Sequence, residues 1–225
     1  MESVSQSRPP LVPADGAGLD RLEGPEAAAR LYALAQNQEP GAGLWLRGAD
    51  LSGEDLEGLD LSRCLLEGCR FTGAGLRHLS LADCILNRCD LSGAQAYDGS
   101  LLRCRWQGTK ALGCSLAGVR ARDWAAADCR LDALRLDDAG LERVCLARCT
   151  LAGANLSGLR WKQLTLSEVD LSGANITGCA LRGLDLRSCR LEGLTAGPAL
   201  RELRGAIVDP IQAAELARLL GLDIR

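Results

Sequence analysis

The stretch LSGEDLEGLDLSRCLLEGCRF, residues 51–71, sets a pattern that runs through most of the chain. A large apolar residue stands at every fifth position: Leu51, Leu56, Leu61, Leu66 and Phe71. The series extends without an insertion from Leu46 to Leu191, over thirty consecutive apolar positions. The residue two places before each is small or apolar almost throughout, and glycine occupies fifteen of the thirty places two residues after.

A period of five matches neither the helical period of 3.6 nor the strand period of 2.0. It fits a short extended segment with two inward side chains two residues apart, followed by a turn in which glycine tolerates unusual backbone angles. Repetition of this unit predicts a solenoid with flat sides. The segment DLSG recurs at 50–53, 90–93 and 170–173, and these separations of eight and sixteen repeats favour a coil of four repeats, one on each of four sides.

Three segments, GADLSG at 48–53, GANLSG at 153–158 and GANITG at 173–178, resemble the A(D/N)LXX signature of the pentapeptide repeat family. The resemblance covers residues 44–194. It implies an all-β solenoid, a right-handed quadrilateral β-helix with the central Leu and the preceding small residue inside. At ~4.8 Å per coil, the thirty repeats of the chain then predict a rod roughly 36 Å long.

Ten of the eleven cysteines fall in the small inward position: Cys64, Cys69, Cys84, Cys89, Cys104, Cys114, Cys129, Cys149, Cys179 and Cys189. A thiol there serves as a small apolar filler. The alternative, a metal or redox site, would need ligands that converge on a point, whereas these thiols form parallel columns without a histidine. Cys145 is predicted to point outward, about three coils or more from the sole histidine, His78. We therefore expect no catalytic residue, no cofactor, no metal and no enzymatic activity.

The interior pattern is irregular between residues 94 and 128. Alanine replaces the central Leu at several places, while Trp106 takes a central slot and Trp124 a slot that is normally small. Because packed cores conserve volume, the indole of Trp124 is predicted to fill the space that Ala126 leaves. A ligand site is the alternative.

Four parts are expected along the chain. Residues 1–23 are rich in Pro, Gly and charge and predict a flexible arm, and residues 24–43 predict a capping helix, helical from Pro25 to Gln36. The repeats occupy 44–194. Residues 195–225 predict a C-terminal helix and a capping or dimerisation module: Asp209, Pro210 and Gln212 have capping-box spacing, Gly221 ends the helix, and 222–224 form a possible strand.

The segment GAIVDPIQAAELARLLGLDI, residues 205–224, resembles the C-terminal module of gyrase-protecting pentapeptide repeat proteins of the MfpA and Qnr type. That module pairs two rods end to end, so the resemblance implies a homodimer. The interface candidates are Ile211, Ala213, Leu216, Ala217 and Leu220. A monomer capped by its own helix is the alternative.

The same resemblance implies a function, namely an acidic rod that engages DNA gyrase or topoisomerase IV and protects it from fluoroquinolone-like or natural-product inhibitors, by DNA mimicry or direct docking. The balance of basic and acidic residues in the repeats tests whether this rod is acidic. Residues 45–194 contain 19 basic and 19 acidic residues, so the rod is neutral. The side around Leu56 is acidic, and its partner-binding candidates are Asp55, Glu57, Asp98, Asp137 and Asp138.

The next side, around Leu61, is basic, with eight basic residues against four acidic ones. The basic residues include Arg103, Arg120, Arg122, Arg143, Arg160, Lys162 and Arg182. Without aromatic platforms or a reading motif, direct nucleic-acid binding is not expected. The N-terminus lacks a signal-peptide pattern and no window is apolar enough to span a membrane, which predicts a cytoplasmic protein without membrane contact. The alternative function is a general protein-interaction scaffold with an unrelated partner.

Overall fold

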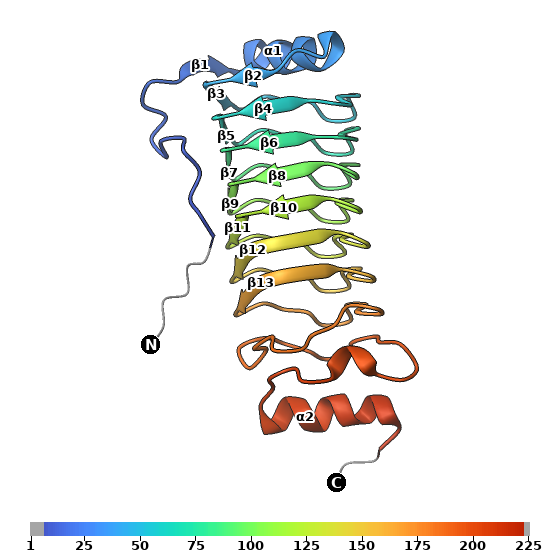
Figure 1. Ribbon diagram of the computed structural model, residues 1–225. Coiled ribbons are helices and arrows are strands. Elements are labelled where there is room, and N and C mark those ends of the chain that lie inside the picture. The colour runs from blue at the N-terminus through green and yellow to red at the C-terminus, as the bar shows by residue number, and fades with distance from the viewer. Residues whose placement is uncertain (1–6, 223–225) are drawn as a thin grey trace.

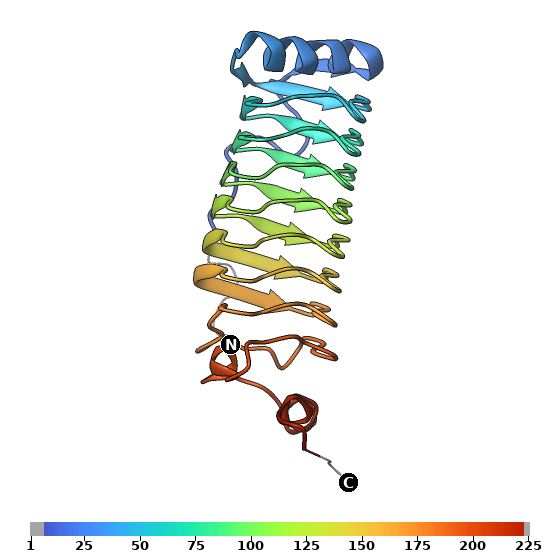
Figure 2. The ribbon, with the colours of Figure 1, turned by 90° about the vertical axis from the view of Figure 1, so that its right-hand side faces the viewer.

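The computed structural model describes residues 7–222 and shows a straight rod with a helix at each end (Figures 1 and 2). Thirteen strands form one parallel sheet that winds around the rod. The elements are β1 (Asp20–Glu23), α1 (Gly24–Asn37), β2 (Gly41–Ala42), β3 (Leu44–Arg47), β4 (Asp60–Ser62), β5 (Leu65–Glu67), β6 (Ser80–Ala82), β7 (Ile85–Asn87), β8 (Ser100–Leu102), β9 (Arg105–Gln107), β10 (Arg120–Arg122), β11 (Ala125–Ala127), β12 (Gly140–Ala147), β13 (Arg160–Ser167), η1 (Arg201–Leu203), α2 (Pro210–Ala217) and η2 (Arg218–Leu220).

The register of the strands confirms the coil of four repeats. Leu61 pairs with Leu81, and Leu81 with Leu101, so each partner stands four repeats further along the chain. Isolated bridges such as Asp50 with Arg70 continue the same register between the strands. The rod therefore has four sides, which we name after their central residues in one coil as the Leu51, Leu56, Leu61 and Leu66 sides.

Each side ends in a corner residue with left-handed backbone geometry, two places after the central residue. Gly58 has a φ of 74°, and the non-glycine corners Arg103 and Asp138 have φ values of 50° and 56°. Glycine adopts this geometry without steric cost. The corner requirement explains why glycine is so frequent two residues after each central position.

The interior is one continuous apolar cluster of the central residues and the small residues before them. Leu61, Leu76 and Leu91 are buried, as are Ala74 and Ala94 in the small slots. Since both slots of each repeat face inward, every coil adds apolar area to the same core, and each coil is held mainly by its two neighbours.

Helix α1 covers the first coil, where Leu31, Leu34 and Ala35 are buried against the core. The helix was expected from Pro25 to Gln36 and extends from Gly24 to Asn37. It shields apolar side chains that the open end of a solenoid would expose.

The N-terminal arm differs from the flexible segment expected for residues 1–23. Residues 7–23 lie along the outside of the rod (Figure 1), and β1 pairs with β3. Further down, the backbone N–H of Leu11 donates to Asp83 and that of Arg8 donates to Asp123, at 3.1 and 3.0 Å. Val12 is buried against Leu65 and Ile85. Residues 1–6 lie outside the described residues.

The ladder is interrupted near the C-terminal end, whereas thirty consecutive repeats, at four per coil, predict a continuous series of coils. Strand β13 pairs with β12 and with no other strand among residues 7–222. The rod resumes below as turns and isolated bridges, such as that between Asp185 and Ile207. Within the same residues, no helix is both long and apolar enough to cross a lipid bilayer.

Candidate interaction surfaces

The cysteine columns lie in the core. All ten cysteines predicted to point inward are buried, which confirms their packing role, and all are free thiols. The Cys104 thiol donates to the Leu81 carbonyl oxygen at 3.4 Å, and burial raises the pKa of Cys104 and of Cys114 to about 12. Among residues 7–222, no group of three or more His, Cys, Asp or Glu side chains is placed to hold a metal ion.

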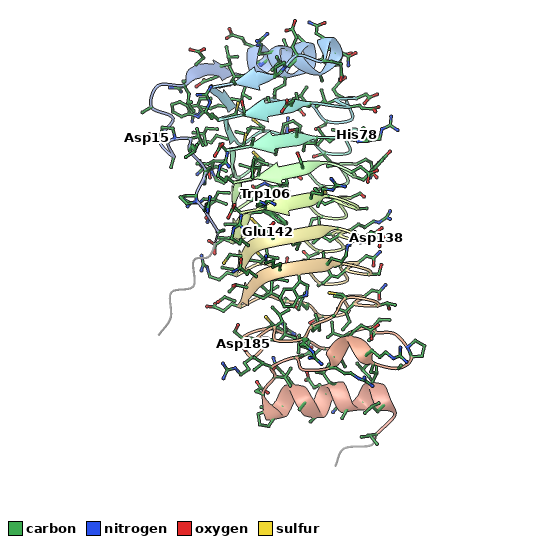
Figure 3. All side chains as sticks on the ribbon, viewed as in Figure 1. Asp15, His78, Trp106, Asp138, Glu142 and Asp185 are labelled. Carbon is green, nitrogen blue, oxygen red and sulfur yellow. The ribbon has the colours of Figure 1, made fainter. Side chains whose placement is uncertain are left out.

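Cys145 and His78, the outward cysteine and the sole histidine, lie on different parts of the rod. Cys145 is half-buried in an outward position of β12, between Ala125 and Thr165, and desolvation raises the pKa of its thiol. His78 occupies a corner beyond the Leu56 side, and its Nδ1 lies 3.5 Å from the carbonyl oxygen of Asp98 (Figure 3). Cys145 therefore lies on a different side of the rod, the Leu66 side.

The tryptophan pair belongs to the core. Trp106 and Trp124 are both fully buried and meet edge to face, with ring centroids 5.2 Å apart and ring planes at 69°. Trp124 and Ala126 are both buried, so the indole lies inside the rod, while its filling of the space beside Ala126 stays a prediction. The pair completes the packing of the core where alanines interrupt the leucine series.

The five acidic candidates of the Leu56 side divide into two groups. Glu57 forms an ion pair with Arg77, and Asp137 forms one with Arg135 at 3.1 Å. Asp55, Asp98 and Asp138 form no ion pair within the described part of the chain. Asp98 and Asp138 stand at the same corner, two coils apart, and both are exposed. Three of the five carboxylates thus lie outside the ion pairs of residues 7–222, and that of Asp55 accepts the backbone N–H of Glu57 at 3.2 Å.

The corner between the Leu61 and Leu66 sides carries residues of alternating charge that we call the charge ladder: Arg63, Asp83, Arg103, Asp123 and Arg143. Arg103 donates to both carboxylate oxygens of Asp83 at 2.7 and 2.6 Å, and Arg143 donates to both of Asp123 at 2.8 Å. Both aspartates are nearly buried, at 5% and 2% exposure. These contacts neutralise two arginines of the predicted basic side.

The rest of the basic side surrounds a shallow hollow of about 830 Å³. Gly140 lines it between Arg120 and Arg160 of the adjacent coils, and Asp138 lines it as well. Arg122 pairs with Glu142 at 2.9 Å. Arg120, Arg160 and Lys162 are exposed and form no ion pair within residues 7–222. The basic character of this side is therefore concentrated near β13.

The C-terminal helix α2 closes the rod through a buried glutamine. Asp209 and Gln212 form the predicted capping box, and Gly221 adopts the left-handed geometry that ends the helical segment. The Gln212 amide donates to the carbonyl oxygens of Leu186 and Cys189, at 2.8 and 2.7 Å. Gln212 thus supplies hydrogen bonds that a further coil would otherwise provide.

The five interface candidates differ in exposure, and four of them lie on α2 whereas Leu220 lies on η2. Leu216 packs against the core of its own chain, whereas Ile211 and Leu220 are 75% and 66% exposed. Ala213 is exposed and Ala217 is half-buried. Apolar exposure extends to Leu222, the last described residue; residues 223–225, which include part of the possible strand at 222–224, lie outside the described residues. The outward surface of the module is therefore apolar at Ile211 and Leu220.

Replacement of Gln212 by alanine is expected to lower the free energy of unfolding by about 1–3 kcal/mol, because two buried carbonyl groups lose their donor. The measurement is chemical unfolding followed by circular dichroism. Gln36→Ala is the matched control, since it removes an exposed bond from the other terminal helix to Asp55 and is expected to cost less than about 0.5 kcal/mol. Equal losses in both variants would contradict the role of Gln212.

These features define a class: a four-sided β-solenoid whose functional surfaces are its outer sides and its ends. The family model described as Pentapeptide repeats matches in eight copies, over residues 45–77, 55–93, 145–183 and 162–193. Residues 45–93 and 145–193 therefore consist of pentapeptide repeats, and the register of four repeats per coil continues between them. No curated protein sequence matches it.

Solved structures of the same kind are similar to the chain at low identity. A trypsin-treated variant of QnrB1, a plasmid-mediated fluoroquinolone resistance protein, is 21% identical, with 92% of this chain and 99% of that chain covered and a TM-score of 0.39. HetL, a protein involved in heterocyst differentiation regulation in the cyanobacterium Nostoc sp. strain PCC 7120, is 22% identical, with coverage of 80% and 94% and a TM-score of 0.43.

Proposed function

We propose that the chain is a non-enzymatic, cytoplasmic rod that binds type II DNA topoisomerase, DNA gyrase or topoisomerase IV, and protects it from fluoroquinolone-like or natural-product inhibitors. The C-terminal module carries this proposal. Residues 205–224 resemble the end module of gyrase-protecting pentapeptide repeat proteins, and this module leaves Ile211 and Leu220 exposed beyond the rod. Exposed apolar side chains at the end of a rod suit pairing with a second copy.

The contact surface that we propose on each rod is the corner of Asp98 and Asp138 together with Asp55. These three carboxylates form no ion pair within residues 7–222, so they are available to basic groups of the enzyme. Most other acidic residues of the rod face an arginine, which suits direct docking through a local patch better than mimicry of DNA over the full length of the rod.

The test is a supercoiling assay with purified gyrase, and in parallel with topoisomerase IV, in the presence of a fluoroquinolone. Micromolar full-length chain is expected to preserve activity that the drug otherwise abolishes. The Asp98→Asn/Asp138→Asn variant is expected to lose protection, and Asp60→Asn, an exposed change on the Leu61 side, is expected to retain it. Absence of both protection and inhibition with both enzymes would contradict the proposal and favour a scaffold with an unrelated partner.

Dimer formation gives a separate prediction. The Ile211→Asp/Leu220→Asp variant is expected to weaken a dimer by at least about 100-fold, because two apolar side chains become charged at the interface. Light scattering coupled to size exclusion measures the molar mass, and Arg218→Asp is the control on the same module. A wild-type monomer at micromolar concentration would contradict pairing through this module. Leu216→Asp is less informative, since Leu216 also contacts its own rod.

A further inference from the structure

The interruption below β13 is an opening that we call the seam. It lies between β13 (Arg160–Ser167) and residues 180–188 (Figure 1). Within residues 7–222, no backbone-to-backbone hydrogen bond crosses it, although the other two sides of the same coil stay connected. There, Leu171 N–H donates to Arg190 at 2.9 Å and Ile176 N–H donates to Thr195 at 2.8 Å. Along the Leu61 and Leu66 sides, the coil below β13 is held instead through side chains, as where Glu168 N–H donates to the Ser188 hydroxyl at 3.2 Å.

The cause is the side chain of Trp161. In the repeat, the N–H of a central residue donates to a carbonyl oxygen of the next coil, as Leu91 does to Lys110 at 2.7 Å. At the seam the equivalent carbonyl, that of Ala180, accepts a 2.8 Å bond from the indole N–H of Trp161 instead. The indole therefore bridges β13 and the coil below at this end of the seam.

Trp106 also occupies a central slot, yet the ladder continues past it. Its neighbours in the core, Ala111 and Ala126, are small. The corresponding neighbours of Trp161 are Leu166 and Leu181, which are larger, so the core has less space for the indole of Trp161 than for that of Trp106. Overpacking of this kind displaces backbone, and here it holds the coil of residues 180–188 away from β13.

The seam exposes a strand edge with an apolar lining. Trp161, Leu164 and Leu166 are half-buried, whereas Val144 and Leu146, one coil above, are buried. By the repeat pattern, the N–H groups of Trp161, Gln163 and Leu166 and the carbonyl oxygen of Leu164 point into the opening. A hollow of about 540 Å³ lies along the Leu164–Ser167 part of this edge. Unsatisfied edges of this length are templates for another strand.

The rim of the seam is basic. Arg160 and Lys162 project from β13 and Arg182 from the coil below, and none of them forms an ion pair within residues 7–222. Asp185, across the opening, is already paired with Arg187 at 2.7 Å (Figure 3). Glu168, just beyond the far end of β13, is acidic. The charge at the Arg160 end of the seam therefore suits an acidic occupant.

We propose that the edge of β13 binds an extended acidic segment of a partner protein as an added parallel strand. The segment displaces the Trp161 indole from Ala180 and restores the ladder with β13. Its alternate apolar side chains contact Trp161, Leu164 and Leu166, and its acidic side chains face Arg160 and Lys162. The proposal does not depend on the topoisomerase partner, because it is argued from the edge of β13 alone, although Asp138 lines the same hollow as Arg160, Trp161 and Lys162.

The experiment uses full-length protein and a capped synthetic peptide of sequence ELEGLELE, which repeats the inward and outward pattern of β13 with acidic outward positions. Amide hydrogen exchange is measured by NMR. In the free protein, the amides of Trp161, Gln163 and Leu166 are expected to exchange at least about 100-fold faster than those of Leu141 and Leu146. The peptide is expected to slow them, and the lysine analogue KLKGLKLK is not.

Two variants make the outcome decisive. Trp161→Leu installs the commonest central residue, so the seam is expected to close: the β13 amides become protected without peptide and peptide binding falls at least about tenfold. Arg160→Glu/Lys162→Glu keeps the seam open and is expected to reverse the preference toward the lysine peptide. Protected β13 amides in the wild type, equal binding of the two peptides, or undiminished binding to Trp161→Leu would each overturn the proposal.

Discussion

Replacing Trp124 by alanine is expected to lower the free energy of unfolding by about 3–5 kcal/mol. The side chain is fully buried, and its contact with Trp106 adds an edge-to-face interaction at 5.2 Å. The neighbouring Ala111 and Ala126 cannot fill the cavity because they carry only a methyl group. Urea unfolding followed by far-UV circular dichroism measures the loss.

A rescue variant sharpens this prediction. Trp124→Ala/Ala126→Leu restores the usual arrangement of the repeat, a small residue followed two places later by leucine, and is expected to recover most of the lost stability. Tyr32→Ala, an exposed aromatic on α1, is the control and is expected to cost less than about 0.5 kcal/mol. A loss below about 1 kcal/mol for Trp124→Ala would mean that the core collapses around the site.

The second large effect concerns Asp123. Asp123→Asn removes the charge that receives two bonds from Arg143, and it weakens the acceptor for the backbone N–H of Arg8. We expect a loss of about 1–3 kcal/mol and faster amide exchange at Arg8 and Leu11. Asp128→Asn is the matched control, because Asp128 forms the same bidentate pair with Arg148 on the exposed surface. It is expected to cost less than about 1 kcal/mol and to leave the arm in place.

Lowering the pH should release the N-terminal arm, because it protonates Asp83 and Asp123, which accept hydrogen bonds from the arm. Hydrogen bonds from Arg143 and Arg103 hold the pKa of Asp123 and of Asp83 below the ordinary aspartate value. A lowered pKa in the folded state stabilises the protein above the unfolded value of about 3.9, and this contribution is lost as pH falls through the folded pKa. Protection of the Leu11 amide should therefore persist at neutral pH and disappear well below pH 4. Loss of protection between pH 7 and 5 would contradict this assignment.

The sequence was sufficient to predict the solenoid, its four sides and the inward cysteines, because one inward pattern repeats at every coil. The charge ladder was also accessible in principle. Once the coil of four repeats is known, Asp83 with Arg103 and Asp123 with Arg143 are neighbours by spacing alone. Sequence counts instead assigned these arginines to a basic side, since the counts did not consider pairing between adjacent coils.

Other features depend on three-dimensional packing and could not be obtained from the repeat. Trp161 obeys the apolar pattern, and it separates two coils only because its neighbours Leu166 and Leu181 are too large to leave space for the indole. Residues 7–23 have the composition of a flexible segment, yet their backbone N–H groups find acceptors at Asp83 and Asp123. Backbone N–H groups are the same in almost every residue, so contacts of this kind cannot be predicted from the amino-acid sequence of the arm.

The docked arm also constrains the order in which the chain can acquire its structure during synthesis. Coils of a solenoid can form one after another as they leave the ribosome, since each contacts mainly its neighbours. Arg8, however, meets Asp123 across 115 residues, and Asp123 is itself held by Arg143. Residues 8–12 must therefore wait until Asp123 and Arg143 have been translated, and during that interval the apolar column of Leu65 and Ile85 is uncovered and open to other proteins.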